Sequence, residues 1–330
     1  MTTMRLADTI GQIARYGGQG LRESIAIAAA RVGAAADRWS GKPEAAALRY
    51  GYLVRNIQLA RESMVTYRRL ARLSKPANFD LRPAEELQRF VLFIGYSRSG
   101  HSLVAALLDA HPNVVVSHEL HAVKHLKAGS AFSDVARAIQ LNSYYFNHFG
   151  RGYTGYDYQV PGQHQGHCTE LKVLGDKKAN GTCRALLKDP ELVGWLERTV
   201  PVPVTFVHVI RNPWDNIASR ARRTGLSLDG AADGYLRNAA AIQTLRRRYP
   251  AQVIDVYLDE LSATPVEILR GMLDRLGIGA DEQYLADCAA IVFQSPRQTQ
   301  REFDWPPALR ARIAEELRRL DHLRRFADAA

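Results

Sequence analysis

Cysteine is scarce in this chain of 330 residues, which contains only Cys168, Cys183 and Cys288. Their odd number and wide spacing argue against a disulfide framework, a zinc site or a redox motif, and indicate reduced thiols. Long apolar runs are missing too. No stretch reaches the roughly 18 residues of a membrane span, and Arg5 and Asp8 interrupt any signal-like region near the start. These absences predict a cytoplasmic protein.

Patterns for binding metal ions and nucleic acid are missing as well. His121 and His125 have the i, i+4 spacing of a helical pair, but the sequence contains no His-Glu-x-x-His string, so we expect no metal. The net charge of +10 and the pI of about 9.6 favour anionic partners such as phosphorylated cofactors or acidic lipids. Aromatic residues do not alternate with basic ones in a stacking pattern, so we expect no nucleic-acid partner.

The first quarter of the chain carries most of the positive charge. Residues 1–85 contain 14 Lys and Arg against 7 Asp and Glu, so this segment accounts for +7 of the +10. Its Ala, Leu and Arg pattern predicts two or three helices, and Pro76 and Pro83 predict a linker after them. Three roles stay open for this helical extension: binding an acidic membrane surface, packing against the remaining domain, or contacting a second copy in a homodimer.

The sequence pattern of residues 86–330 is typical of one α/β domain. Short apolar runs alternate with helical patterns, and the runs cover residues 90–94, 114–116, 171–174, 204–210 and 253–257. Runs of this kind, buried on both faces, are typical of parallel sheets covered by helices. We therefore predict a three-layer α/β fold with a parallel sheet flanked by helices. Residues 142–167, rich in Tyr, Gly and His, are expected to form an irregular insertion.

A segment with glycine near both ends, Gly95 to Ser102 (GYSRSGHS), follows the first expected strand and opens a helix. A loop at a helix N-terminus presents free N–H groups to an anion, so this segment predicts a phosphate-binding site. The spacing is that of an ATP-type P-loop, but His101 stands where that loop has an invariant lysine. ATP hydrolysis and kinase chemistry are therefore disfavoured.

Two segments resemble the sulfotransferase family. Residues 90–120 (FVLFIGYSRSGHSLVAALLDAHPNVVVSHEL) are similar to its 5′-phosphosulfate loop, Pro-Arg/Lys-Ser-Gly-Thr/Ser, with the helix and His-Pro turn that follow; the style is closest to the tyrosylprotein and carbohydrate branches. Residues 209–219 (VIRNPWDNIAS) resemble the 3′-phosphate motif, in which Arg211 and Ser219 would hold the phosphate. The chain departs from the family loop at Ser97, which replaces proline, and at His101, which replaces Thr or Ser.

The resemblance implies a P-loop-like fold and a transferase that uses 3′-phosphoadenosine 5′-phosphosulfate (PAPS). Such an enzyme moves the sulfuryl group to an acceptor hydroxyl, of a class unknown here, and releases 3′,5′-phosphoadenosine (PAP) without a metal. The residues implied to bind the nucleotide are Ser97, Arg98, Ser99, Gly100, His101, Ser102, Arg211 and Ser219. Arg297 lies where some members bring a further loop to the nucleotide.

Sulfuryl transfer is expected to need cations and a base. Like phosphoryl transfer, it is an in-line displacement that depends on positioning and on positive charge near the transferred group. Arg98 in the loop is one candidate cation. By resemblance Lys177, in the stretch that follows the third expected strand, is another, with Lys178 as its alternative.

The acceptor hydroxyl needs a group that takes its proton. Glu119, at the end of the second expected strand, matches the position of a glutamate base in the tyrosylprotein branch. The cytosolic branch uses a histidine, which keeps His118 and His121 as alternatives. The altered loop also suggests a second function, that of a non-catalytic nucleotide-binding or scaffold protein with the same fold.

Overall fold

The structure is a computed structural model, and it describes residues 81–147 and 158–329. By their contacts, residues 66–221 and 226–330 form one compact unit, and the fold described below is that of its described part. The expected N-terminal helices lie outside the described residues, so the boundary near residue 85 stays a prediction. Within the described residues, every helix is too short or too polar to cross a membrane.

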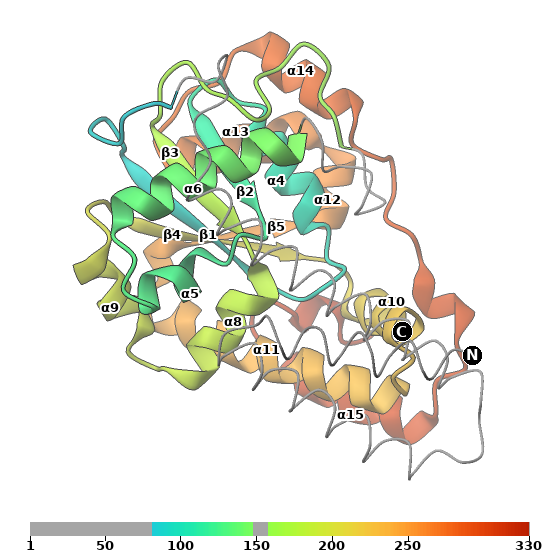
Figure 1. Cartoon of the computed structure of the whole chain (residues 1–330). Coiled ribbons are helices and arrows are strands. Elements are labelled where there is room, and N and C mark those ends of the chain that lie inside the picture. Colours follow the sequence, from blue (N-terminus) through green and yellow to red (C-terminus); the bar gives the residue numbers. More distant parts are fainter. Residues whose placement is uncertain (1–80, 148–157, 330) are drawn as a thin grey trace, which may run out of the picture. The chain divides into compact units, whose positions relative to one another are not determined.

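Five parallel strands form the sheet, in the order β2-β3-β1-β4-β5 (Figure 1). Their bounds are β1 (Arg89–Gly95), β2 (Val114–His118), β3 (Val173–Lys177), β4 (Val204–Ile210) and β5 (Val253–Tyr257). Four of them lie where apolar runs predicted strands. The prediction for β3 was wrong by two to three residues, because Asp176 and Lys177 continue the ladder opposite Ser117 and His118 of β2.

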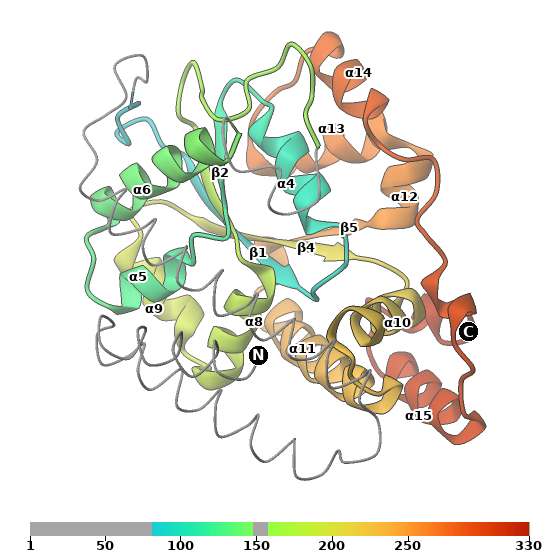
Figure 2. The same ribbon diagram turned by 45° about the vertical axis from the view of Figure 1, so that its right-hand side comes forward.

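Helices cover both faces of the sheet, as the apolar runs predicted. Their bounds are α4 (His101–Asp109), α5 (Ala122–Lys127), α6 (Phe132–Tyr145), α8 (Ala179–Lys188), α9 (Leu192–Thr199), α10 (Pro213–Thr224), α11 (Leu228–Arg248), α12 (Leu258–Ala263), α13 (Pro265–Leu276), α14 (Glu282–Ala290) and α15 (Pro307–Arg318). Figure 2 shows α4, α12 and α13 on one side of the strands, and α8 and α11 on the other. Because α6 extends to Tyr145, the expected irregular insertion begins with helix.

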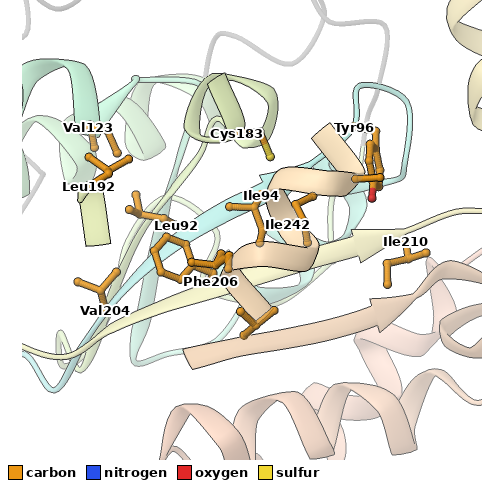
Figure 3. Close-up of a cluster of buried hydrophobic side chains, with 14 of the residues drawn as sticks. Leu92, Ile94, Tyr96, Val123, Cys183, Leu192, Val204, Phe206, Ile210 and Ile242 are labelled. Atoms are coloured by element: carbon orange, nitrogen blue, oxygen red, sulfur yellow. The ribbon is translucent and has the colours of Figure 1, made fainter. Parts of the chain in front are cut away.

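Alternating side chains of β1 divide the core into two halves, as the pleat of a strand requires. Leu92 and Ile94 point into the half that contains residues of α8, α9, α10 and α11. Figure 3 shows these two side chains near Phe206 of β4. Val91 and Phe93 point into the half formed with α4, α12, α13 and α14. Both faces of the strand are therefore buried, which explains its nearly unbroken apolar run.

The order of the strands places a topological switch point between β1 and β4. From β1 the chain turns to α4 on one face and then to β2, whereas from β4 it turns to α10 and α11 on the other face and then to β5. In open parallel sheets, the carboxyl ends of two strands whose connections diverge in this way form the usual binding crevice. The loops after β1 and β4 lie at this switch point.

Candidate active site

The loop between β1 and α4 depends on its two glycines. Gly95 and Gly100 have φ angles of 133° and 97°, which residues with a Cβ rarely adopt. A Cβ on Gly100 would also lie 2.8 Å from a side-chain carbon of Leu258. Gly100 is the N-cap of α4 and brings no side chain of its own to the end of the helix. The loop therefore has the backbone of an anion cradle, with N–H groups at a helix start.

His101 does not replace the lysine of an ATP-type loop. Its ring is buried, and Nε2 lies 3.1 Å from the carbonyl oxygen of Ile94. Because a carbonyl oxygen only accepts hydrogen bonds, Nε2 carries the proton and donates it. Burial lowers the pKa of His101 to about 3, so the ring is neutral near neutral pH. The ring is therefore bonded to the backbone of β1 and brings no positive charge to the loop.

The second motif lies where β4 runs into α10. Arg211 follows the strand, and Asn212 Oδ1 accepts a hydrogen bond from Trp214 N at 3.0 Å in the first turn of the helix. Ser219 lies about two turns into α10, as predicted, and its side chain faces the interior. The guanidinium of Arg211 is also largely buried and donates to Thr299 Oγ1 at 3.1 Å and to the carbonyl oxygen of Arg297.

The two motifs touch each other directly. Arg98 Nε donates to Ser219 Oγ at 3.3 Å, and Arg211 donates to the carbonyl oxygen of Arg98 at 3.4 Å. Ser99 Oγ accepts a hydrogen bond from Asn216 Nδ2 at 2.8 Å. These contacts join segments more than 110 residues apart in the sequence, and they follow from the pairing of β1 with β4. The two motifs therefore lie side by side.

Asn216 was missed by the sequence reasoning. It is fully buried and links the helix of the second motif to the first loop. A signal was available, because Asn216 precedes Ser219 by three residues and so shares its helix face. The side chain of Arg297 does not reach this cluster; it pairs with Glu302 at 2.8 Å.

A carboxylate and two ammonium groups gather at the ends of β2 and β3. Lys177 Nζ lies 3.2 Å from Glu119 Oε1, and Lys178 Nζ lies 2.5 Å from Glu119 Oε2. The Lys177 side chain is only 5% exposed, whereas that of Glu119 is 46% exposed and can meet a ligand. Partial burial opposes ionisation of Glu119, but Lys177 and Lys178 outweigh this and hold its pKa well below the usual value.

The alternative histidine bases flank this cluster. His118 stacks on Phe146 with ring centroids 3.8 Å apart, and its Nε2 lies 3.5 Å from Lys177 Nζ. Burial and the neighbouring Lys177 lower the pKa of His118. Burial, together with Lys178, lowers the pKa of His121 to about 4. Of the three candidates, Glu119 is the one that contacts both lysines.

A pocket borders the first turn of α4 and His118. It lies between α4, the end of β2 and the end of α6, and its walls include Ser102, Ala105, Val116, His118, Phe146 and Tyr158. Several polar groups in the pocket wall already bond within the protein; Gln165, for example, bonds to the backbone of Val160, Ala106 and Tyr158. In the part of the chain that the structure describes, no cluster of three His, Cys, Asp or Glu side chains could hold a metal ion.

A parallel sheet with a glycine-containing loop after β1 defines a P-loop-like α/β protein. Residues 91–282 match the model of the sulfotransferase family, and this match spans more than half of the chain. The protein therefore belongs to the sulfotransferase family. Its branch within the family stays a prediction, and no curated protein matches the sequence.

Solved sulfotransferase structures resemble the chain only distantly. The sulfotransferase domain of the Synechococcus PCC 7002 olefin synthase is 15% identical, with a TM-score of 0.47 over 72% of this chain and 96% of that one. Sulfotransferase STF9 from Mycobacterium avium is 10% identical, with a TM-score of 0.49 over 96% of each chain. Mouse SULT7A1 in complex with PAP is 11% identical, with a TM-score of 0.41 over 78% and 99%. None of these similarities is close enough to transfer a function.

Proposed function

We propose that this protein is a PAPS-dependent sulfotransferase that transfers a sulfuryl group to an acceptor hydroxyl. Membership of the sulfotransferase family supports the reaction class. The observation that carries the proposal is the direct contact between the loop after β1 and the start of α10. A nucleotide with phosphate groups on both its 5′ and 3′ positions is the kind of ligand that two adjoining anion sites would bind.

The residues present fit such a nucleotide. In the proposal, the backbone N–H groups and hydroxyls of residues 97–102 hold the 5′-phosphosulfate, because the loop ends at the N-terminus of α4, where free N–H groups favour an anion. Arg211 and Ser219 hold the 3′-phosphate, for which a planar guanidinium is well suited. Arg98 lies beside Ser219, so we assign it to phosphate binding as well as to its predicted catalytic role.

The proposed chemistry uses Glu119, Lys177 and Lys178. PAPS supplies the sulfuryl group, and PAP is the leaving group. Glu119 takes the proton of the acceptor hydroxyl as the new oxygen–sulfur bond forms. A carboxylate held far below its usual pKa is a weak base. An anionic donor competes with Glu119 for the two ammonium groups, so its binding raises the pKa of Glu119 and strengthens the base.

The acceptor is proposed to approach Glu119 from the pocket beside α4. The pocket borders Ser102 in the first turn of α4 and His118, which directly precedes Glu119 in the chain. Its apolar lining, from Ala105, Val116 and Phe146, favours an acceptor with an apolar portion next to the hydroxyl. The class of acceptor beyond this stays open.

The test is to incubate the protein with PAPS and a panel of acceptors, and to measure the PAP that is released. The panel contains 4-nitrophenol, a tyrosine peptide, N-acetylglucosamine and dodecanol. We expect at least one acceptor to raise PAP release above that in buffer, and calorimetric titration to show that PAP binds. Binding of PAP without turnover on any acceptor would favour the non-catalytic alternative, and failure to bind PAP would refute both.

The location and partners remain predictions. The three cysteines are free and buried, and we propose a cytoplasmic location. For the basic segment 1–85, co-sedimentation of the full-length protein with anionic and with neutral liposomes tests membrane binding. Equal binding to both would contradict attraction to an acidic surface, and light scattering would report a homodimer.

A further inference from the structure

Asp176 is a buried carboxylate at the end of β3 that faces the turn after β2. Its side chain is among the most buried charged groups described, since the residue is 1% exposed. Asp176 Oδ1 accepts hydrogen bonds from Leu120 N at 3.0 Å and from Ser117 Oγ at 2.9 Å. Asp176 Oδ2 accepts one from Ala122 N at 2.8 Å. All three donors belong to the same short turn, residues 117–122.

That turn is strained at two positions. Glu119 and His121 have φ angles of 58° and 73°, in the left-handed region that residues with a Cβ avoid. Such conformations persist only when the surroundings hold them, and they gather at functional sites. The two backbone N–H groups that Asp176 binds belong to Leu120 and Ala122, each of which directly follows a strained residue.

The strained turn directs Glu119 toward the two lysines. Ser117 and His118 of β2 pair with Asp176 and Lys177 of β3. Two neighbouring residues at the end of β3 therefore make different contacts. Asp176 bonds to the backbone of the turn, and Lys177 pairs with the carboxylate of Glu119 in the same turn. A relaxed turn would move Glu119 relative to Lys177 and Lys178.

We propose that Asp176 is a positioning residue, whose carboxylate holds the turn of residues 117–122 so that Glu119 faces Lys177, Lys178 and the acceptor. The proposal rests on the proposed function, because it gives a role to the neighbour of the Glu119 base. Asp176 itself touches no substrate; it acts through the backbone of the turn.

The test is Asp176→Asn in the full-length protein. An asparagine keeps the size of the side chain but turns one acceptor oxygen into a donor, so one of the two backbone N–H groups of the turn loses its partner. We expect kcat, measured as PAP release with the best acceptor of the panel, to fall about 100-fold, because small misplacements of a catalytic group have effects of this size. KM for PAPS should not rise, and PAP affinity should not weaken. Amide hydrogen exchange at Leu120 and Ala122 should become faster.

A matched control is Asp281→Asn. Asp281 also accepts a hydrogen bond from a backbone N–H, that of Tyr284 at 2.7 Å, but it caps α14 on the surface. This variant should keep the kcat of the wild type. Undiminished PAP affinity in Asp176→Asn separates a positioning role from general unfolding, because an unfolded chain would lose its nucleotide site.

A double variant shows whether Asp176 acts through Glu119. If it does, Asp176→Asn lowers kcat in the wild type but not in Glu119→Gln, since the group to be positioned is already inactive. A further 100-fold loss in the double variant would overturn the proposal, and so would unchanged exchange at Leu120 and Ala122. If Glu119→Gln alone keeps full turnover, the proposed base is wrong, whatever the exchange rates show about the turn.

Discussion

Replacing Glu119 by glutamine separates its role as a base from its role in ion pairing. Glutamine keeps the shape and an oxygen that can accept a hydrogen bond from Lys177, 3.2 Å away, but it cannot take a proton. General bases contribute roughly 10²- to 10⁴-fold to a rate. We therefore expect Glu119→Gln to lower kcat by at least about 100-fold, which corresponds to about 2.7 kcal/mol of activation free energy.

The same substitution should not weaken donor binding. Glu119 neutralises two ammonium groups, one of them on the almost fully buried Lys177. Without the carboxylate, both charges become available to the anionic donor, so the affinity for PAPS should stay equal or rise. Loss of turnover combined with unchanged or tighter PAPS binding is a signature that general damage to the fold would not produce.

The assay combines initial rates of PAP release with calorimetric titration of PAPS in the absence of acceptor. The matched control is Glu170→Gln, because Glu170 forms a Lys–Glu pair of similar length with Lys172, at 2.8 Å, on the surface. Exposed pairs of this kind contribute little, and the control should match the wild type in both measurements. Full turnover in Glu119→Gln would refute the base assignment and point to His118 or His121.

Three further predictions follow from individual side chains. Gly100→Ala should weaken PAP binding in a calorimetric titration, because its φ of 97° is unfavourable for alanine and the new methyl group would lie 2.8 Å from a leucine side chain. Lys178→Met should raise the pKa of Glu119 toward its ordinary value. Because the base works only when deprotonated, the acid limb of the pH profile of kcat/KM should move to higher pH. The control Lys188→Met should leave this limb in place. Burial raises the pKa of Asp109 from 3.8 to about 6, so its contribution to stability is present at low pH and is lost as the pH rises through about 6. In urea unfolding at pH 4 and pH 7, Asp109→Asn should lack this loss of about 2 kcal/mol.

Sequence patterns predicted the parallel sheet and placed the two motifs after its first and fourth strands. Apolar runs such as residues 204–210 are buried on both faces, and this burial produces their composition. The pattern failed at the end of β3. Asp176 and Lys177 are polar, yet they continue the strand. Asp176 bonds to Ser117 of the neighbouring strand β2, and Lys177 pairs with Glu119, which directly follows β2.

Hydrogen bonds between segments that are distant in the sequence could not be predicted from the sequence alone. The bonds from Asp176 to the turn span more than 50 residues, and that between Ser99 and Asn216 spans 117. The ring of His101 illustrates a different limit. Its place in the loop suggested a contact with the ligand. Instead, the ring donates a hydrogen bond to the buried carbonyl oxygen of Ile94. Local spacing does not reveal which partner a side chain finds.

In the proposed function, one nucleotide bridges the loop after β1 and the start of α10. Calorimetric titration of PAP and of adenosine 5′-phosphate, which lacks the 3′-phosphate, tests it in the wild type and in Arg211→Gln. Hydrogen bonds to charged groups contribute about 1.5–3 kcal/mol, so the wild type should prefer PAP by at least about tenfold. Arg211→Gln should lose that preference, whereas Arg237→Gln, on the exposed face of α11, should keep it. Equal affinity of the wild type for both nucleotides, or an undiminished preference in Arg211→Gln, would show that the nucleotide does not bridge the two motifs.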